Sequence, residues 1–199
     1  MKPIAVLYAT REGHTRRIAD EVAHVLAGHG LLAQAIDLAQ QPDPGDLHRF
    51  GAVVVASPVH VGTFAPEVIE FARQHHAELD HMPCALLSVT LSEAGVERTD
   101  ATPEQHAKFV ADVNGMNAHF FEETGWHPAR VKNVAGAIAY SRYNFLVKLV
   151  MKRIARQSGG STDTSRDHDY TDWVALDRFV SAFAEDLLAE AKEPDRLPS

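Results

Sequence analysis

Short apolar runs alternate along this chain with longer stretches of helical period, and this alternation limits the possible folds more than any other feature. The runs predicted to be strands are residues 4–9, 31–38, 52–57, 84–90 and 131–140. A strand with one face in water alternates apolar and polar residues, whereas these runs are apolar almost throughout. The pattern therefore predicts parallel strands whose sheet is covered by helices on both faces.

Between and after these strands, apolar residues recur at intervals of three and four, which is typical of amphipathic helices. The predicted helices are residues 14–29, 64–79, 102–124 and 171–191. In the third, Thr102 and Gln105 match a capping box, with Pro103 at the first helical position. Strands and helices in this order form an α/β fold with a doubly wound five-stranded parallel sheet.

One segment interrupts the alternation. Residues 141–170 lie between the fifth strand and the last helix, begin with a helical pattern of their own and end in a polar loop. At roughly 150 residues per domain, we expect a single domain over residues 1–191 that contains this insert, followed by a disordered tail at 192–199. At the end of the insert, we expect Asp169 and Thr171 to cap the last helix.

Composition excludes several classes of protein. The 19 Lys and Arg against 27 Asp and Glu give a formal charge of −8, which disfavours nonspecific binding to nucleic acid. Cys84 is the single cysteine, so no internal disulfide forms, and no Cys and His residues have the spacing of a structural zinc site. A strand pattern follows Met1 directly, unlike a signal peptide, and no apolar run approaches the length of a membrane span. We expect a protein of the reduced cytoplasm without a metal site.

The charge is unevenly distributed. Residues 124–162 contain seven Lys and Arg and no Asp or Glu, which leaves 12 Lys and Arg against 27 Asp and Glu elsewhere. Within this segment Lys148, Lys152 and Arg156 follow one another at i, i+4 and i+8, where like charges cost about 0.2–0.5 kcal/mol per pair. An anionic partner beside this stripe would offset the repulsion. The alternative is a solvated cationic face on an ordinary packed helix.

The turn after the first strand has the features of a phosphate site. It consists of Thr10, Arg11, Glu12, Gly13, His14 and Thr15. Ligands of doubly wound sheets bind outside the carboxyl ends of the strands, where a helix N-terminus offers unpaired backbone N–H groups. The turn adds hydroxyls at both ends but matches neither G-x-x-x-x-G-K-[ST] nor G-x-G-x-x-G, so it predicts a monophosphate ligand. Simple capping of the helix by the two threonines is the alternative.

A carboxylate beside a phosphate is unfavourable. We therefore expect Glu12 to contribute its backbone N–H and to turn its side chain to solvent.

Two further strand ends are expected at the same edge of the sheet. The third strand leads into Ser57, Pro58, Val59, His60, Val61 and Gly62, and the fourth ends in Ser88, Val89, Thr90, Leu91 and Ser92. Both segments could hold a flat ring between backbone and apolar side chains. A receiver domain of the same topology is disfavoured because Thr10 and Ser57 stand where that class needs acidic residues. His60 is the nearest acid–base candidate, but we assign no catalytic residue.

Four sequence motifs are more specific than these patterns. They are TREGHT at 10–15, MP-x-A-x-x-SV at 82–89, GAIAYSRY at 136–143, and KLVMKRIARQSGGSTDT at 148–164 followed by YTDW at 170–173. With these motifs the chain resembles the bacterial flavodoxin-like, menaquinone-dependent protoporphyrinogen IX oxidase family. The resemblance implies a flavodoxin-like fold with the strand order 2-1-3-4-5, FMN bound at the three segments above, and oxidation of protoporphyrinogen IX to protoporphyrin IX in haem biosynthesis. The flavin carries the chemistry and the electrons pass to a membrane quinone.

The resemblance also implies a role for the insert. Its cations would meet the propionates of the tetrapyrrole or the anionic headgroups of the membrane that holds the quinone, so we expect a cytoplasmic protein, peripheral on the inner face of the cell membrane. The candidate contacts are Tyr140, Arg142, Tyr143, Phe145, Lys148, Leu149, Lys152, Arg153 and Arg156. Two other functions stay open: a soluble flavodoxin-like electron carrier or quinone reductase, and a flavin-free binding module. A homo-oligomer also stays open.

Overall fold

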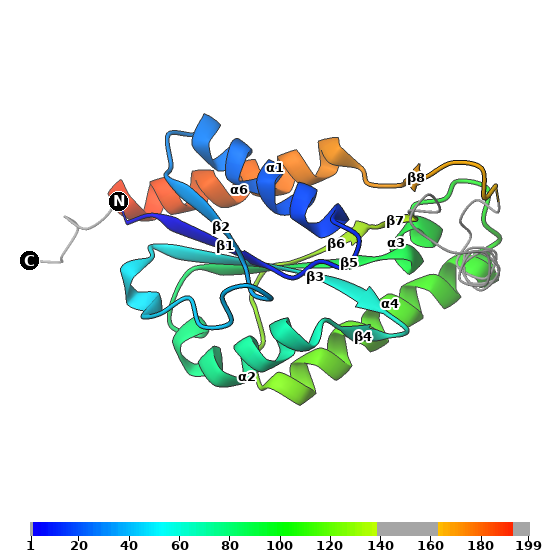
Figure 1. Cartoon of the computed structure of the whole chain (residues 1–199). Coiled ribbons are helices and arrows are strands. Elements are labelled where there is room, and N and C mark those ends of the chain that lie inside the picture. Colours follow the sequence, from blue (N-terminus) through cyan, green and yellow to red (C-terminus); the bar gives the residue numbers. More distant parts are fainter. Residues whose placement is uncertain (1, 139–162, 193–199) are drawn as a thin grey trace, which may run out of the picture.

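The structure, a computed structural model, describes residues 2–138 and 163–192. Its centre is a parallel sheet (Figure 1). The parallel strands are β1 (Ile4–Tyr8), β2 (Ala33–Asp37), β3 (Ala52–His60), β5 (Cys84–Thr90) and β6 (Val131–Ala135). They are paired in the order β2-β1-β3-β5-β6. Because β4 is a short addition to β3, this is the order 2-1-3-4-5 of the long strands, and the predicted fold class is confirmed.

Helices cover both faces of the sheet (Figure 1). On one face, α1 (His14–Gly28) and α6 (Trp173–Lys192) pack on alternate strand residues such as Val6 and Val54. On the other, α2 (Pro66–Leu79) and α4 (Pro103–Thr124) pack over the intervening residues, such as Leu7 and Val55. Successive side chains of a strand point to opposite faces, so both sets of residues are buried. This explains why the strands are apolar without alternation.

Two of the predicted strands, 52–57 and 131–140, differ most from the observed ones. β3 continues past residue 57 to His60 and turns back into β4 (Thr63–Phe64), which pairs antiparallel with it. The predicted strand at 131–140 is divided, since β6 ends at Ala135. After Gly136, β7 (Ala137–Ile138) pairs antiparallel with β8 (His168–Asp169) in a separate two-stranded sheet. The end of the insert therefore returns to the end of β6, a long-range pairing that local patterns do not reveal.

Two short helices were not predicted. η1 (Leu47–Arg49) precedes β3, and its first turn is capped by Asp46, whose Oδ1 accepts from His48 N at 2.8 Å. α3 (Leu91–Val96) begins directly after β5, where Thr90 Oγ1 accepts from Ser92 N at 3.2 Å. Both are too short to give a helical period in the sequence.

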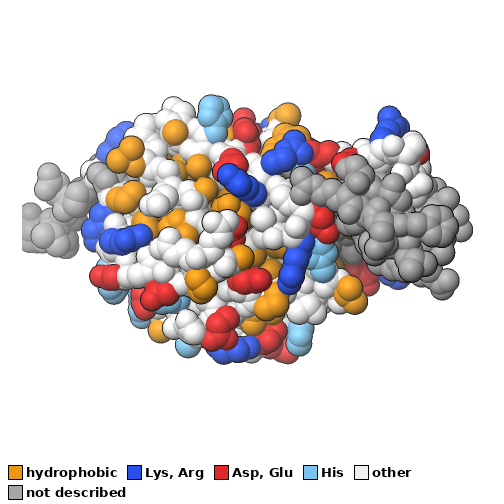
Figure 2. All heavy atoms as spheres, in the orientation of Figure 1, with side chains coloured by type: hydrophobic (Ala, Val, Ile, Leu, Met, Phe, Trp, Pro, Cys, Tyr) orange, Lys and Arg blue, Asp and Glu red, His pale blue; other side chains and the backbone are white. Residues whose placement is uncertain are grey.

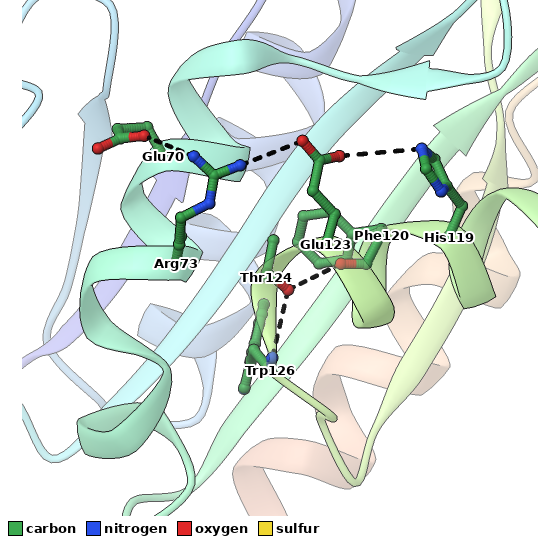
Figure 3. Close-up of polar contacts among 7 residues, drawn as sticks. All are labelled: Glu70, Arg73, His119, Phe120, Glu123, Thr124 and Trp126. Atoms are coloured by element: carbon green, nitrogen blue, oxygen red, sulfur yellow. Dashed lines mark hydrogen bonds and ion pairs between the residues drawn. The ribbon is translucent and has the colours of Figure 1, made fainter.

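Side-chain bonds fix both ends of α4. The capping box of Thr102 and Gln105 is present as predicted. At the other end, Thr124 Oγ1 donates to Phe120 O at 2.8 Å and accepts from Trp126 N at 3.2 Å (Figure 3). Trp126 is completely buried, so these bonds direct the chain from the helix back into the core.

An ion-pair network joins α4 to α2 at the surface. Arg73 contacts Glu70 on its own helix and Glu123 on α4, each at 3.2 Å, and Glu123 also lies 4.0 Å from His119 (Figure 3). Pairs as exposed as these contribute little individually, about 0–1 kcal/mol. The packing of the two helices therefore depends mainly on their apolar contacts.

The predicted cap of the last helix was wrong. Asp172 Oδ1 accepts from Ala175 N at 2.9 Å. An N-cap side chain accepts from the backbone N–H three residues later, so Asp172 is the N-cap of α6. Asp169 and Thr171 make other contacts, described below. The misassignment arose because four consecutive residues, Asp169 to Asp172, include three with side chains that can cap a helix.

The nine candidate substrate or membrane contacts, from Tyr140 to Arg156, lie outside the described residues, as does most of the predicted tail. Of the insert, the structure describes residues 163–170, which include β8. No helix within the two described ranges combines the length and the apolarity that crossing a bilayer requires.

The described surface is mixed in character. Figure 2 shows acidic, basic and apolar side chains interspersed over the visible face. In the part of the chain that the structure describes, the large apolar side chains that are exposed are Leu32, Val61 and Val174. Val61 is the most exposed of them, at 98%, and it lies in the two-residue turn between β3 and β4.

The contact between α3 and α4 gives a test of the fold. A Cβ added at Gly95 would meet the buried ring of Phe109 at 2.6 Å, whereas a Cβ at Gly115, in the exposed middle of α4, would meet nothing within 4 Å. We expect Gly95→Ala to lower the free energy of unfolding by about 1–3 kcal/mol through overpacking. The matched control, Gly115→Ala, should raise it by about 0.5–1 kcal/mol. Urea denaturation measures both, and equal effects would contradict the α3–α4 packing.

Candidate functional site

A pocket of about 220 Å³ lies at the carboxyl edge of the sheet, and we call it the edge pocket. Three segments supply most of its lining: the turn after β1, the β3–β4 hairpin, and the end of β5 with the start of α3. Its lining residues are Thr10, Arg11, Glu12, His14, Thr15, Pro58, Val59, His60, Val61, Gly62, Val89, Thr90, Leu91, Ser92, Met116, Gly136 and Ala137. Parallel pairing brings these segments to one edge, as the sequence analysis expected.

The turn after β1 presents the N-terminus of α1 to this pocket. Gly13 occupies the N-cap position with φ of +89°, a conformation that favours glycine, and no side chain caps the helix. Simple capping by Thr10 and Thr15 is therefore excluded. Gly13 N donates to Thr10 Oγ1 at 2.9 Å, so this amide is used inside the turn, while the Thr10 hydroxyl keeps its own proton to donate. Thr15 is 2% exposed and lines the pocket.

The expected position of the Glu12 side chain was wrong. Its carboxylate is turned toward the hairpin rather than to solvent, with Oε2 3.8 Å from His60 Nε2, and the side chain is 30% exposed. His60 pairs with Thr63 at the end of the β3–β4 ladder. The Glu12–His60 contact thus joins the turn after β1 to the tip of the hairpin. The two residues are 48 positions apart, so no local pattern in the sequence predicts this contact.

Two of the predicted serines lie beneath the pocket rather than in its lining. Ser57 is completely buried within β3, where its Oγ donates to Pro58 O at 3.0 Å and accepts from Ala65 N at 3.1 Å. Ser88 is 1% exposed within β5 and pairs with Ser57 across the sheet. The Ser57 hydroxyl thus joins the end of β3 to the start of α2, whereas the buried Ser88 hydroxyl has no hydrogen-bond partner among the described residues. Both serines fell inside the predicted segments because the sequence shows where a strand ends only approximately.

Three lining residues were missed. Gly136 and Ala137 follow β6, and they could have been found by applying the strand-end rule to the fifth strand as well. Met116 reaches the pocket from the middle of α4. An apolar residue in an amphipathic helix has the same sequence pattern whether it faces the core or a pocket, so no local signal distinguishes Met116.

His14 connects the turn to residues far along the chain. Its Nε2 lies 2.8 Å from Thr171 Oγ1, and Thr171 Oγ1 donates to Ala135 O at 2.7 Å. The hydroxyl has a single proton, which the carbonyl takes, so His14 Nε2 must carry the hydrogen in the first bond. The buried Thr171 hydroxyl therefore ties the start of α1 to the end of β6.

Charged and aromatic groups surround this contact. Asp169 Oδ1 accepts from Thr171 N at 3.0 Å and lies 3.8 Å from His14 Nε2, while Asp169 Oδ2 lies 3.3 Å from Arg17 Nη1. The guanidinium of Arg17 also lies over the ring of Trp173, 5.2 Å from its centre. Trp173 is partly buried and packs against the core.

The pKa of His14 is held below its ordinary value of 6.5. Burial is the main cause, because it disfavours the imidazolium; Asp169 acts in the opposite direction and Arg17 adds to the lowering. With Nε2 protonated, the neutral ring leaves Nδ1 as an acceptor.

Other possible ligand groups lie away from this pocket. Asp46, His48 and Glu78 have donor atoms within 4.8 Å of one another, the single such group of three found in the described ranges. They come from η1 and the last turn of α2, so they lie near the opposite edge of the sheet. They take no part in the edge pocket.

The chemistry of the edge pocket suits a flat anionic ligand. Its lining combines hydroxyls, Arg11 and the uncapped start of α1 with the apolar residues Pro58, Val59 and Leu91. No Trp or Tyr occurs among its described lining residues, and no nucleophile–base–acid arrangement is present there. Such a site can bind and orient a ring with a phosphate arm, but its described side chains form no catalytic triad.

Comparison with known proteins identifies similar chains. A family model described as a flavodoxin domain matches residues 5–165. A protoporphyrinogen IX dehydrogenase (quinone) of Leishmania major is 32% identical over 189 residues, covering 95% of this chain and 78% of that protein. The protein of the same name from Escherichia coli strain K12 is 30% identical over 179 residues, covering 90% and 93% respectively. The solved structure of oxidised flavodoxin 1 from Bacillus cereus has the same fold, with a TM-score of 0.50, 13% identity, and coverage of 92% of this chain and 97% of that one.

The Thr171 hydroxyl can be tested by mutation. Thr171→Val keeps the shape of the side chain but removes the hydroxyl that bonds the carbonyl of Ala135 and the Nε2–H of His14. We expect the free energy of unfolding to fall by about 1–3 kcal/mol. Thr171→Ser restores the hydroxyl and should recover most of the loss. Thermal or urea denaturation measures both variants. Equal stability of the Val and Ser variants would contradict this role of the hydroxyl.

The buried His14 also predicts a dependence of stability on pH. Because its pKa is lowered on folding, the folded state binds fewer protons than the unfolded state below about pH 6.5. This contribution is fully present above pH 6.5 and is lost as the pH falls. We expect the difference in unfolding free energy between pH 7.5 and pH 5 to be smaller in His14→Gln, whose amide can still donate to Thr171. Urea unfolding curves of both proteins at several pH values measure this difference. The same pH difference in His14→Gln as in the wild type would contradict the role of His14.

Proposed function

The chain belongs to the flavodoxin-domain family, within the group of the protoporphyrinogen IX dehydrogenases, and on that premise we propose that it is an FMN-dependent oxidoreductase. Its proposed reaction is the oxidation of protoporphyrinogen IX to protoporphyrin IX, with a quinone as electron acceptor. The observation that carries the proposal is the edge pocket. There the turn after β1, the β3–β4 hairpin and the end of β5 meet at the carboxyl edge of the sheet.

The residues of the turn fit the phosphate of FMN. The uncapped N-terminus of α1 offers backbone N–H groups, and the hydroxyls of Thr10 and Thr15 can donate beside them. Arg11 lines the same part of the pocket and has the right charge for an anion. The Glu12 carboxylate faces His60 of the hairpin.

The size of the pocket supports a ligand that stays partly exposed. The 220 Å³ enclosed by the described residues is less than the roughly 300–1,000 Å³ of pockets that bury most of a drug-sized ligand. A flavin that must exchange electrons with a second molecule needs such an open side. Pro58, Val59 and Leu91 would cover the apolar part of the ring and exclude water from it.

FMN, when bound, supplies the hydride and electron chemistry, and the protein positions and tunes it. The residues of this chain then act by binding and orientation: the turn holds the phosphate, the hairpin and α3 border the ring, and the Thr171 bonds fix the start of α1. We assign no residue to acid–base catalysis. This division of roles agrees with a pocket whose described side chains contain no catalytic triad.

We also propose that the quinone is reached at the membrane surface, with the protein bound peripherally to its cytoplasmic face. The support is the composition of residues 124–162, with seven Lys and Arg and no Asp or Glu. Cations near an anionic surface each contribute about 1 kcal/mol of attraction.

The proposal is tested on the purified chain. We expect a yellow protein whose released cofactor is FMN, and formation of fluorescent protoporphyrin from protoporphyrinogen under anaerobic conditions when a menaquinone analogue is supplied. Thr15→Val should weaken FMN binding by about 10- to 100-fold, as expected for a lost hydrogen bond to a charged group. Thr15→Ser is the matched control and should bind as the wild type does.

Each outcome separates one possibility. A chain that FMN neither binds nor stabilises would exclude any flavin-dependent function. A flavin-containing chain that reduces quinones, but oxidises protoporphyrinogen no faster than the spontaneous background, would be an electron carrier or a quinone reductase instead.

A further inference from the structure

Val61 combines two features that are unfavourable for a valine. It is the single non-glycine residue with positive φ in the described ranges, at +52°, and its side chain is 98% exposed. A β-branched residue in the left-handed region is strained, and asparagine or glycine is the usual choice in a two-residue hairpin turn. Neither packing nor turn geometry therefore accounts for a valine here. Strained residues of this kind cluster at ligand sites.

The hairpin holds this residue in a defined place. Val59 pairs with Phe64 and His60 with Thr63, so the turn at Val61 and Gly62 is closed by a regular ladder. Phe64 is buried and stacks on Phe120 of α4, with ring centres 4.3 Å apart. On the other side, the contact of His60 with Glu12 joins the tip to the turn after β1. These contacts fix the hairpin and therefore the position of Val61 at its tip.

Val61 lies at the rim of the edge pocket. It is among the lining residues, yet its side chain is almost fully exposed, whereas Val59 two residues earlier is only 9% exposed. A ligand seated in the pocket would be covered by residues such as Pro58 and Val59. An apolar side chain at the rim would meet a second molecule that approaches from solvent.

We propose that Val61 is a specificity-determining contact for the apolar ring system of the molecule that exchanges electrons at this pocket. This inference rests on the proposed function. A quinone ring is flat and a porphyrinogen is a macrocycle bent at its methylene bridges, but both present apolar carbon surface, and the contact serves whichever of the two packs against the hairpin. Covering the exposed isopropyl group releases apolar surface from water, which offsets the strain of the turn in the complex but not in the free protein.

The test uses three variants that separate strain from apolar contact. Val61→Thr keeps the β-branched shape and the strain but replaces a methyl group with a hydroxyl. Val61→Asn also removes apolar surface but suits the left-handed conformation, and Val61→Leu keeps an apolar side chain. We expect the Thr and Asn variants to raise the KM for one of the two rings by about three- to tenfold, as for loss of one or two buried carbon groups. Val61→Leu should keep a KM near that of the wild type.

Two further readouts exclude a structural role. Val61→Asn should unfold at the same or a higher urea concentration than the wild type, and the change in KM should exceed any change in the affinity for FMN, measured by titrating FMN into the cofactor-free chain. KM values measured separately for protoporphyrinogen and for the menaquinone analogue show which ring uses the contact. Unchanged values for both in the Thr and Asn variants would overturn the proposal, and so would a change confined to FMN affinity.

Failure of the proposed function can be told apart from failure of this inference. If the wild type does not oxidise protoporphyrinogen, the inference is judged on equilibrium binding of protoporphyrin and of the menaquinone analogue to the flavin-loaded chain. Weaker binding of either ring to Val61→Thr and Val61→Asn, but not to Val61→Leu, upholds it. Binding that is absent in the wild type or equal in all variants refutes it.

Discussion

Parallel pairing of β1, β3 and β5 is the constraint on which the rest of the structure depends. Because the strands run the same way, their carboxyl ends meet at one edge, and the turn after β1, the β3–β4 hairpin and the start of α3 are brought together there. The same pairing requires a crossover in each connection, and the helices packed on the sheet bury both faces of the strands. The uncapped start of α1 and the apolar tip of the hairpin become neighbours for this reason alone.

Contacts between distant segments then refine this edge. The Thr171 hydroxyl connects Ala135 and His14, and the Glu12 carboxylate faces His60, so the turn after β1 is held from two sides. In the free protein this leaves the backbone N–H groups of α1 available rather than capped. A site whose donors are already oriented loses less conformational freedom on binding an anion. Part of this support comes from Thr171, which does not belong to the proposed flavin contacts.

The proposed function relates to this architecture through what the pocket contains and what it lacks. Hydroxyls, helix amides and apolar walls can orient a flavin, and the described lining has no catalytic triad that would act without one. Val61 is strained and exposed at the rim of the pocket. We infer that it contacts the ring of a second molecule beside the proposed flavin. Membership in the flavodoxin-domain family and the names of its relatives agree with such a division between cofactor and protein.

The sequence by itself determined the layered fold and the three segments of the site, because the apolar period of a strand or helix and the direction of parallel strands are local and topological properties. The strand order followed only from the family motifs. Only the tertiary structure decided which side chains face the pocket. Ser57 and Ser88 lie beneath it, Met116 reaches it from α4, and Glu12 is turned to His60. The cap of α6 and the pairing of β7 with β8 were likewise decided by contacts across the chain. Side-chain direction at a strand end depends on neighbours distant in sequence, and no period in the sequence encodes them.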